Sequence, residues 1–189
     1  MISAQNYVRL MGMIITLIGY RGSGKSSLAG PLADQLGWCA IDADDEIEQR
    51  AGKTIAEIFA DDGEPKFREL ERQVMKNLLE SDQLIIAAGG GAILNEKTRS
   101  QMKAAGPVVW LRASVDVLAA RIGGDETTAA RRPNLTSTGG REEIERVLAE
   151  REPLYRECAS CTVDTGSWTV DEMIAKIVDA AGPLSEKDG

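Results

Sequence analysis

The 189-residue chain contains no histidine. This absence excludes Ser-His-Asp and Cys-His hydrolases, imidazole general bases and most zinc enzymes, because each of these depends on an imidazole side chain. Phosphoryl transfer remains open, since it relies on lysine, arginine, Mg²⁺ and a carboxylate. Positive charge is also in deficit, because 22 Lys and Arg against 30 Asp and Glu leave a net charge of −8. A chain this acidic is not expected to bind nucleic acid, whose phosphates it would repel.

Cysteines are few, and long hydrophobic runs are missing. The three cysteines, an odd number, suit the reducing cytosol and predict a cytoplasmic protein. Cys158 and Cys161 have the spacing of half a zinc site or of a redox pair. No second pair of this kind and no histidine could complete a metal site, so we expect ordinary packing near a strand. The mostly apolar run Met13–Ile18 is too short to cross a membrane or to form a signal core, so we expect no membrane partner.

The most informative motif that is present is a phosphate-binding loop. Residues Gly19–Ser26 read GYRGSGKS, which fits G-x-x-x-x-G-K-[ST], and they lie between the strand-like run Ile14–Ile18 and the helix-like run Ser26–Leu36. The glycines let backbone N–H groups surround phosphate oxygens, next to the positive end of a helix. Lys25 would neutralise the β- and γ-phosphates, and the hydroxyl of Ser26 would bind Mg²⁺, the expected cofactor. The residues expected to contact ATP here are Gly22, Ser23, Gly24, Lys25, Ser26 and Ser27.

Strand-like and helix-like segments alternate along the chain. The strand-like segments are Ile14–Ile18, Trp38–Ile41, Leu84–Ala88, Val108–Leu111 and Thr162–Val163. The helix-like segments are Ser26–Leu36, Asp45–Ala51, a short one capped by Thr54, Glu64–Ser81, Asn95–Ala105, Val115–Arg121, Arg141–Arg156 and Val170–Ala181. Because strands separated by helices form parallel sheets covered on both faces, we predict an α/β fold that binds ligands at the carboxyl ends of the strands.

The chain is long enough for one domain with a full core and too short for two large ones. We expect this domain to occupy residues 13–181, between an N-terminal tail at 1–12 and a polar C-terminal tail at 182–189. Within it, Gly123–Gly140 is polar, has no hydrophobic period and is bounded by glycine pairs that can act as hinges. We call this segment the lid and expect it to be mobile and to close over the nucleotide.

Asp42 and Asp44 directly follow the second strand-like segment. Side chains two positions apart on an extended segment point the same way, so both carboxylates would face the phosphate-binding loop. One could hold Mg²⁺ through water while the other accepts the proton of an attacking hydroxyl. Taken alone, the pair could also be an acidic N-cap of the helix that follows. Their position after the second strand of a fold with a phosphate-binding loop favours the functional interpretation.

Two further groups of residues bear on the phosphate acceptor. Arg68 and Glu71 are three residues apart on a helix-like segment, so they can pair and present a rigid guanidinium fork to a carboxylate. The alternative is a solvated surface ion pair, which is the commoner case for this spacing. Gly89–Gly91 follow a strand-like segment, and such a run costs entropy on folding. It indicates a close approach of the backbone to another group, although a plain loop is the alternative.

Taken together, these motifs resemble those of the shikimate kinases. In chain order the pattern is GxxGxGKS, DxD, IF-x₃-GE-x₂-FR-x₂-E, GGG, an RP-containing lid and R-x-PLY. The corresponding residues are Gly19–Ser26, Asp42–Asp44, Ile58–Glu71, Gly89–Gly91, Arg132-Pro133 and Arg151–Tyr155. The resemblance covers nearly the whole chain. Many kinases share the phosphate-binding loop, whereas the GExxFRxxE segment together with GGG and RxPLY is far more specific.

The resemblance implies transfer of the γ-phosphate of ATP to the 3-hydroxyl of shikimate, in the pathway to aromatic amino acids. It also implies the fold of nucleoside monophosphate kinases, a three-layer αβα arrangement with a central five-stranded parallel sheet. The substrate-binding region would lie at about 42–71 and the mobile lid at about 123–140. The partners would be ATP or ADP and shikimate. Because the sequence shows no long apolar heptad or other assembly signal, we expect a monomer.

On the nucleotide side, the resemblance implies that Asp42 reaches Mg²⁺ through water, beside Ser26. Arg121 would lie on the adenine, near the loop Asp164–Gly166. Arg132 would close over the phosphates from the lid. The catalytic residues implied in this way are Lys25, Asp44 and Arg132.

On the acceptor side, the resemblance implies that Asp44 contacts the shikimate hydroxyls and acts as the base. Arg68 and Arg151 would bind the shikimate carboxylate. Gly90 and Gly91 would offer backbone N–H groups to the substrate. The residues implied to wall or support this pocket are Phe59, Phe67 and Glu71.

Two other functions are compatible with part of the pattern. A gluconate kinase is another small kinase of a sugar acid, but it would not require Arg68 and Glu71 together with GGG and RxPLY. A non-catalytic protein that binds shikimate as a sensor or regulator would be expected to lose the lysine, the base or the lid arginine. Lys25, Asp44 and Arg132 are all present, so the sequence favours an active kinase.

Overall fold

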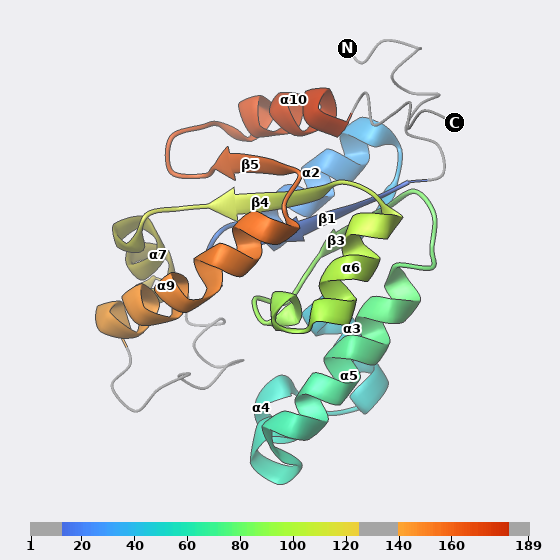
Figure 1. Cartoon of the computed structure of the whole chain (residues 1–189), viewed down its shortest axis with the longest axis vertical. Coiled ribbons are helices and arrows are strands. Elements are labelled where there is room, and N and C mark those ends of the chain that lie inside the picture. Colours follow the sequence, from blue (N-terminus) through green and yellow to red (C-terminus); the bar gives the residue numbers. More distant parts are fainter. Residues whose placement is uncertain (1–12, 125–139, 182–189) are drawn as a thin grey trace.

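The computed structural model describes residues 13–124 and 140–181. The expected tails at 1–12 and 182–189, and the part of the lid at 125–139 that contains Arg132, lie outside the described residues. A five-stranded parallel sheet with strand order β2-β3-β1-β4-β5 lies between two layers of helices, which confirms the predicted three-layer αβα fold (Figure 1). The strands are β1 (Ile14–Ile18), β2 (Cys39–Asp42), β3 (Leu84–Ala87), β4 (Val108–Arg112) and β5 (Cys161–Asp164).

The helices follow the alternation that the sequence predicts. They are α2 (Lys25–Leu36), α3 (Ala43–Ala51), α4 (Ile55–Asp61), α5 (Gly63–Leu78), α6 (Glu96–Ala105), α7 (Val115–Gly123), α9 (Gly140–Cys158) and α10 (Val170–Ala181). A 3-10 turn that the sequence did not predict, η1 (Ala92–Leu94), follows the glycine run. Thr54 and Asn95 cap α4 and α6 through their side chains, as their types favour. In the described part of the chain, no helix is both long enough and apolar enough to span a membrane.

Alternate residues of the central strand β1 pack on opposite faces of the sheet. Ile15 and Leu17 belong to a core shared with α2 and α10, whereas Ile14 and Ile18 belong to a core shared with α3, α5, α6 and α9. Every residue of β1 is buried, because the strand has neighbours on both sides and helices on both faces. This double burial explains why β1 is a nearly continuous apolar run rather than an alternating one.

The register of the strands brings three loops to one edge of the sheet. Leu17 of β1 pairs with Ala87 of β3, and Ala87 pairs with Asp42 of β2. The segments that follow these residues therefore leave the sheet at the same level. They are the phosphate-binding loop, the acidic segment and the glycine run, and all of them lie at the carboxyl ends of the strands, where parallel sheets bind ligands.

The three cysteines are free thiols and make no metal site with other described residues. Cys158 is buried at the end of α9, and Cys161 begins β5. Burial raises the pKa of both of these thiols, which makes each a weaker nucleophile at neutral pH. Cys158 packs in the core on one face of the sheet and Cys161 lies in a strand, which agrees with the expected packing near a strand.

Candidate active site

The loop between β1 and α2 follows a path that requires glycine. Gly22 and Gly24 have φ angles of 78° and 92°, in the left-handed region that other residues rarely adopt. Gly24 is also the N-cap of α2, so the first N–H groups of that helix point toward the loop. Ser23 lies between these glycines and is fully buried. The backbone therefore forms the anion-binding concavity that the motif predicts.

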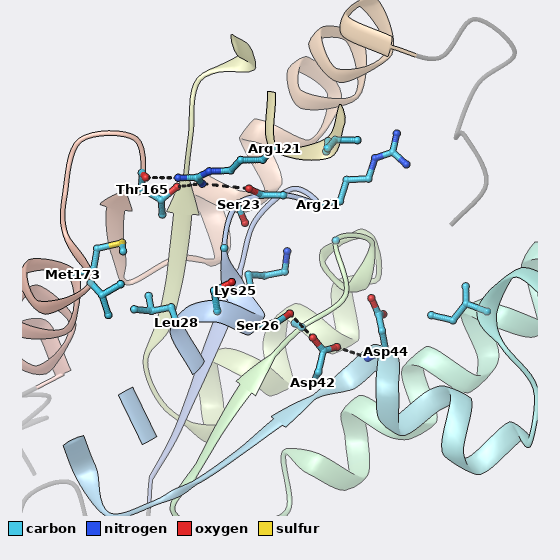
Figure 2. A pocket seen from close by; sticks show the side chains of 18 residues that line it. Arg21, Ser23, Lys25, Ser26, Leu28, Asp42, Asp44, Arg121, Thr165 and Met173 are labelled. Carbon is cyan, nitrogen blue, oxygen red and sulfur yellow. Dashed lines mark hydrogen bonds between the residues drawn. The ribbon is translucent and has the colours of Figure 1, made fainter. Parts of the chain in front are cut away.

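A cavity of about 530 Å³ lies beside this loop, at the carboxyl edge of the sheet (Figure 2). It brings together the loop, the end of β2, the glycine run and the connection after β5. Residues of the predicted nucleotide and metal set that line it are Gly22, Ser23, Gly24, Lys25, Ser26, Ser27, Asp42 and Arg121. Asp44 and Gly90, two of the residues expected to contact the acceptor, line the same cavity. The structure thus places the expected phosphate, metal and base positions around one space.

Lys25 and Ser26 begin helix α2 beside the loop. The Lys25 Nζ donates to the carbonyl oxygens of Gly19 and Tyr20, at 3.0 Å each, so its charge lies within the curve of the loop. The Ser26 hydroxyl donates to Asp42 Oδ2 at 2.5 Å. A hydroxyl beside one carboxylate fits Mg²⁺, which usually binds one or two carboxylates together with substrate phosphates and water. No group of three or more His, Cys, Asp or Glu residues that could hold a metal occurs among the described residues, so phosphate oxygens and water would complete the coordination of Mg²⁺.

The acidic segment differs from its prediction in local structure. β2 ends at Asp42 and α3 begins at Ala43, so Asp44 lies in the first helical turn and not on an extended segment. The predicted reason for the two carboxylates to face the same way is therefore wrong. Asp42 caps the helix, because its Oδ1 accepts a hydrogen bond from the Asp44 backbone N–H at 2.9 Å. Both side chains still line the cavity (Figure 2). The other carboxylate oxygen of Asp42, Oδ2, accepts the hydrogen bond from the Ser26 hydroxyl.

Arg121 of α7 joins three segments at the margin of this cavity (Figure 2). Its guanidinium donates to the carbonyl oxygen and the hydroxyl of Thr165, at 2.7 and 3.1 Å, and to the Gly22 carbonyl at 3.3 Å. Thr165 in turn donates its backbone N–H to the Arg112 carbonyl at 2.8 Å, at the end of β4. The guanidinium is thus fixed between the phosphate-binding loop and the loop that the resemblance assigns to adenine. Stacking on adenine itself stays a prediction.

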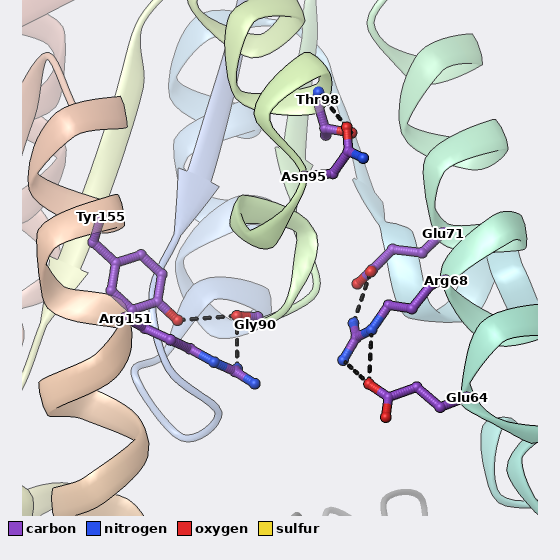
Figure 3. A network of polar contacts seen from close by, with 8 residues as sticks. All are labelled: Glu64, Arg68, Glu71, Gly90, Asn95, Thr98, Arg151 and Tyr155. Atoms are coloured by element: carbon purple, nitrogen blue, oxygen red, sulfur yellow. Dashed lines mark hydrogen bonds and ion pairs between the residues drawn. The ribbon is translucent and has the colours of Figure 1, made fainter.

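Arg68 is held by two glutamates of its own helix, α5 (Figure 3). Its Nη1 donates to Glu71 Oε2 at 2.8 Å, and its Nη2 donates to Glu64 Oε1 at 3.1 Å. Burial of the guanidinium opposes its charge, but Glu71 and Glu64 outweigh burial and raise the pKa of Arg68 above its ordinary value. Glu71 is 3% exposed, so this is not the solvated surface pair of the alternative interpretation. The predicted pairing is confirmed, and Glu64 is an additional support.

Two arginines approach the Gly90–Gly91 peptide from opposite sides (Figure 3). Arg151 of α9 donates from Nη1 to the Gly90 carbonyl oxygen at 3.0 Å. On the other side, a Cβ added to Gly91 would overlap the guanidinium of Arg68, so glycine is required for this contact. Arg68, Glu71 and Gly91 line a second cavity, of about 250 Å³. The backbone of the glycine run therefore lies close to another group, as the sequence predicts. That group is the guanidinium of Arg68, which is expected to bind the substrate carboxylate.

The two expected aromatic wall residues support Arg68. The rings of Phe59 and Phe67 have centroids 4.8 Å apart, and the Arg68 guanidinium carbon lies 5.2 Å from the Phe67 centroid. Phe67 is buried and Phe59 is partly buried. Neither ring lines the two cavities described above. Direct contact of these rings with a substrate therefore stays a prediction.

Two side chains of α9 contact the site in ways that the sequence analysis did not identify. Glu143 is 1% exposed and accepts a hydrogen bond at 3.0 Å from Arg21, which lines the larger cavity. Tyr155 donates its hydroxyl to the Gly90 carbonyl at 3.0 Å. No local signal could have paired Arg21 with a residue so distant in sequence. Tyr155 could have been found, since it is four residues after Arg151 and a helix places both on one face.

Comparison with known proteins shows which family the chain is similar to. The family model for shikimate kinase matches residues 21–181. A shikimate kinase of Rhodopirellula baltica is 46% identical over 165 residues, which cover 87% of this chain and 88% of that protein. The solved structure of a shikimate kinase from Acinetobacter baumannii in complex with shikimate superposes with a TM-score of 0.83 at 33% identity, covering 92% of this chain and 95% of that one. A gluconokinase from Sinorhizobium meliloti superposes with a TM-score of 0.59 at 19% identity, covering 93% and 94%, which shows a shared fold alone.

Proposed function

The chain belongs to the shikimate kinase family, and we propose that it transfers the γ-phosphate of ATP to the 3-hydroxyl of shikimate, giving shikimate 3-phosphate and ADP. This reaction is a step in the pathway to aromatic amino acids. The observation that carries the proposal is one cavity lined by the phosphate-binding loop, Asp44 and Gly90, with two arginines at the adjoining peptide. Shikimate has both groups that such a site would bind, a carboxylate for the arginines and hydroxyls for the aspartate.

In the nucleotide half of the site, the phosphates of ATP would lie against the loop and the first turn of α2. Lys25 would turn from the Gly19 and Tyr20 carbonyls toward the β- and γ-phosphates, whose charge it attracts more strongly. Ser26 and Asp42 would hold Mg²⁺ on the phosphates, as their 2.5 Å contact supports. The metal supplies positive charge that offsets the charge developing on the transferred group. We also propose that Arg132, outside the described residues, adds charge from the lid.

In the acceptor half, Asp44 is the proposed general base. It lines the same cavity as Lys25 and Ser26, so a hydroxyl bound beside it would face the γ-phosphate. As that hydroxyl attacks the phosphorus, its proton would pass to the Asp44 carboxylate. The first turn of α3 holds Asp44 in place, because its backbone N–H donates to Asp42. The metal-binding and base carboxylates are therefore linked by one helix cap.

The carboxylate of shikimate would bind between Arg68 and Arg151. Arg68 stays charged and fixed through Glu71 and Glu64, and Arg151 is fixed by the Gly90 carbonyl. A guanidinium has five N–H donors, so each arginine could keep its present contact and still donate to a carboxylate. Binding the carboxylate at the arginines would leave the ring hydroxyls toward Asp44 and the phosphate-binding loop.

Replacing either arginine by alanine should separate the binding of acceptor from that of nucleotide. In Arg68→Ala and Arg151→Ala, the KM for shikimate is expected to rise by about 10- to 100-fold. This is the usual loss of affinity when one charge-assisted hydrogen bond is removed. The KM for ATP should change little, because neither arginine lines the nucleotide part of the cavity. Steady-state kinetics of ADP release, with each substrate varied in turn, measures both constants.

Arg156→Ala is the matched control for the arginine variants. Arg156 is exposed on the same helix as Arg151 and forms an ion pair with Glu152, one turn earlier in that helix. Its replacement removes the same type of charge and should leave both KM values near those of the wild type. An unchanged KM for shikimate in both Arg68→Ala and Arg151→Ala would show that these arginines do not bind the substrate.

We also propose that the protein is a monomer and that it is located in the cytoplasm. The free thiols of the described residues support a reducing compartment. Among these residues, the large hydrophobic side chains that are exposed are Leu94, Trp168 and Val170, and so small a number supports a monomer, because the core of a stable dimer interface is enriched in such side chains. The two alternative functions are not favoured by the site. Arg68 and Arg151 lie where a carboxylate could bind, which a gluconate kinase would not require in this form. Lys25 and Asp44, which a non-catalytic regulator would be expected to lose, line the cavity.

A further inference from the structure

The Gly90 carbonyl accepts two hydrogen bonds from side chains of α9 (Figure 3). Arg151 Nη1 and the Tyr155 hydroxyl each lie 3.0 Å from this oxygen. A carbonyl oxygen has two lone pairs, so both are used, and the direction of the C=O bond is fixed. Gly90 has no side chain of its own that could fix this peptide. The orientation of the Gly90–Gly91 peptide therefore depends on α9.

We propose that Tyr155 is a positioning residue for shikimate, which acts by fixing the orientation of the Gly90–Gly91 peptide. The inference rests on the proposed function, because it assigns Tyr155 to the acceptor half of that site. Tyr155 itself does not contact the substrate. It acts through the peptide whose N–H group faces the substrate.

The geometry of the peptide gives the direction of that N–H group. The described chain has no cis peptide bonds, and in a trans peptide the C=O and N–H groups point in opposite directions. Since the Gly90 carbonyl points to α9, the N–H of Gly91 points away from α9. Arg68 of α5 lies on the side of Gly90 opposite to Arg151 and Tyr155 (Figure 3). It is close enough to Gly91 that a Cβ there would overlap its guanidinium. Fixing the carbonyl thus presents the Gly91 N–H beside the arginine proposed to bind the carboxylate.

Tyr155 is rigid enough to serve this role. Its side chain is fully buried, and its ring stacks on Trp110 of β4, with centroids 5.8 Å apart and planes at 14°. The hydroxyl is therefore held relative to the sheet and not only to its own helix. Arg151, by contrast, is partly exposed and would also have to serve the substrate carboxylate. Tyr155 is therefore the donor to the Gly90 carbonyl that is not shared with the substrate.

The experiment compares Tyr155→Phe with the wild type in steady-state kinetics, with shikimate and ATP varied separately. Phenylalanine keeps the buried ring and its stacking on Trp110 and removes only the hydroxyl. The KM for shikimate is expected to rise by about 3- to 10-fold, the usual effect of one net hydrogen bond. The KM for ATP and kcat should stay within about twofold of the wild type, since one net hydrogen bond is lost on the acceptor side alone. All assays are run well below the thermal transition of the least stable variant.

Trp110→Phe is the matched control, because it weakens packing against the Tyr155 ring and leaves the hydroxyl in place. It should lower the Tm and raise the KM for shikimate by less than Tyr155→Phe does, because phenylalanine can still pack on the Tyr155 ring and the hydroxyl remains. Equal rises of this KM in Tyr155→Phe and Trp110→Phe would overturn the proposal, since packing alone would then explain them. An unchanged KM for shikimate in an active Tyr155→Phe enzyme would overturn it as well.

These outcomes are distinct from a failure of the proposed function. If the wild-type protein does not phosphorylate shikimate, the function itself is wrong, whatever Tyr155→Phe does. If the wild type is active and the hydroxyl has no effect on the KM for shikimate, the function stands and Tyr155 serves only the core.

Discussion

Replacing Lys25 by methionine is expected to lower kcat by at least about 10³-fold, because it removes a positive charge that stabilises the transferred phosphate. The Lys25 ammonium lies within the curve of the phosphate-binding loop, 3.0 Å from the Gly19 and Tyr20 carbonyls. It is the charge best placed to offset the negative charge of the transferred phosphate. Methionine has a similar length but no charge and no donor, so both the loop contacts and this stabilisation are lost. Single-turnover measurement of ADP formation would detect the residual rate.

Lys53→Met is the control for this variant. Lys53 is partly exposed and pairs with Asp61 and Asp62, and none of these residues lines the cavity. Its replacement should leave kcat unchanged while removing the same type of charge. If Lys25→Met retained kcat within about tenfold of the wild type, phosphate stabilisation by Lys25 would be ruled out.

Asp44→Asn is expected to lower kcat by about 10²- to 10⁴-fold, the usual range for a positioned general base. Asparagine keeps the size of the side chain and its place in the first turn of α3, but it cannot accept the proton of the acceptor hydroxyl. ATP affinity should remain almost intact, because the Ser26–Asp42 contact that supports the metal site does not include the Asp44 side chain. Equilibrium binding of a non-hydrolysable ATP analogue, measured beside kcat, separates the two effects.

The adjacent Asp45→Asn is the control for the base assignment. Asp45 is exposed in the same helical turn and does not line the cavity, so its replacement should leave kcat near the wild-type value. Near-normal turnover in Asp44→Asn would mean that Asp44 is only an acidic residue at the start of a helix. Loss of ATP binding together with turnover would instead place Asp44 in the nucleotide half of the site.

The parts of the fold that local patterns determine were predictable from the sequence. The phosphate-binding loop, the alternation of strands and helices, and the caps at Thr54 and Asn95 each depend on residues close together in the chain. The Arg68–Glu71 pair was predictable for the same reason, because helical spacing alone places the two residues on one face. The Asp42–Asp44 segment was predicted as part of the site, with a helix cap as the alternative, and Asp42 both lines the cavity and caps α3. The cap depends on where β2 ends, and boundaries are set by tertiary packing.

Contacts between distant segments could not be predicted, because they depend on the order of strands in the sheet and on how helices pack against it. Glu143 and Arg21 come from helix α9 and the phosphate-binding loop, and no local pattern relates them. Helical spacing could have placed Tyr155 on the same face as Arg151, but its contact with Gly90 also depends on how α9 lies over the sheet beside the glycine run. The role of Arg132 in the lid stays a prediction, since this residue lies outside the described part of the chain.

The most direct test of the central claim is the identity of the phosphorylated product. The purified protein is incubated with Mg²⁺ and ATP, with shikimate or gluconate as the acceptor, and ADP is quantified while phosphorus NMR identifies the phosphate ester. The proposed function predicts rapid ADP formation only with shikimate, and one equivalent of shikimate 3-phosphate for each ADP. Equal or faster turnover with gluconate, a phosphate on a different hydroxyl, or ADP accompanied only by inorganic phosphate would contradict it.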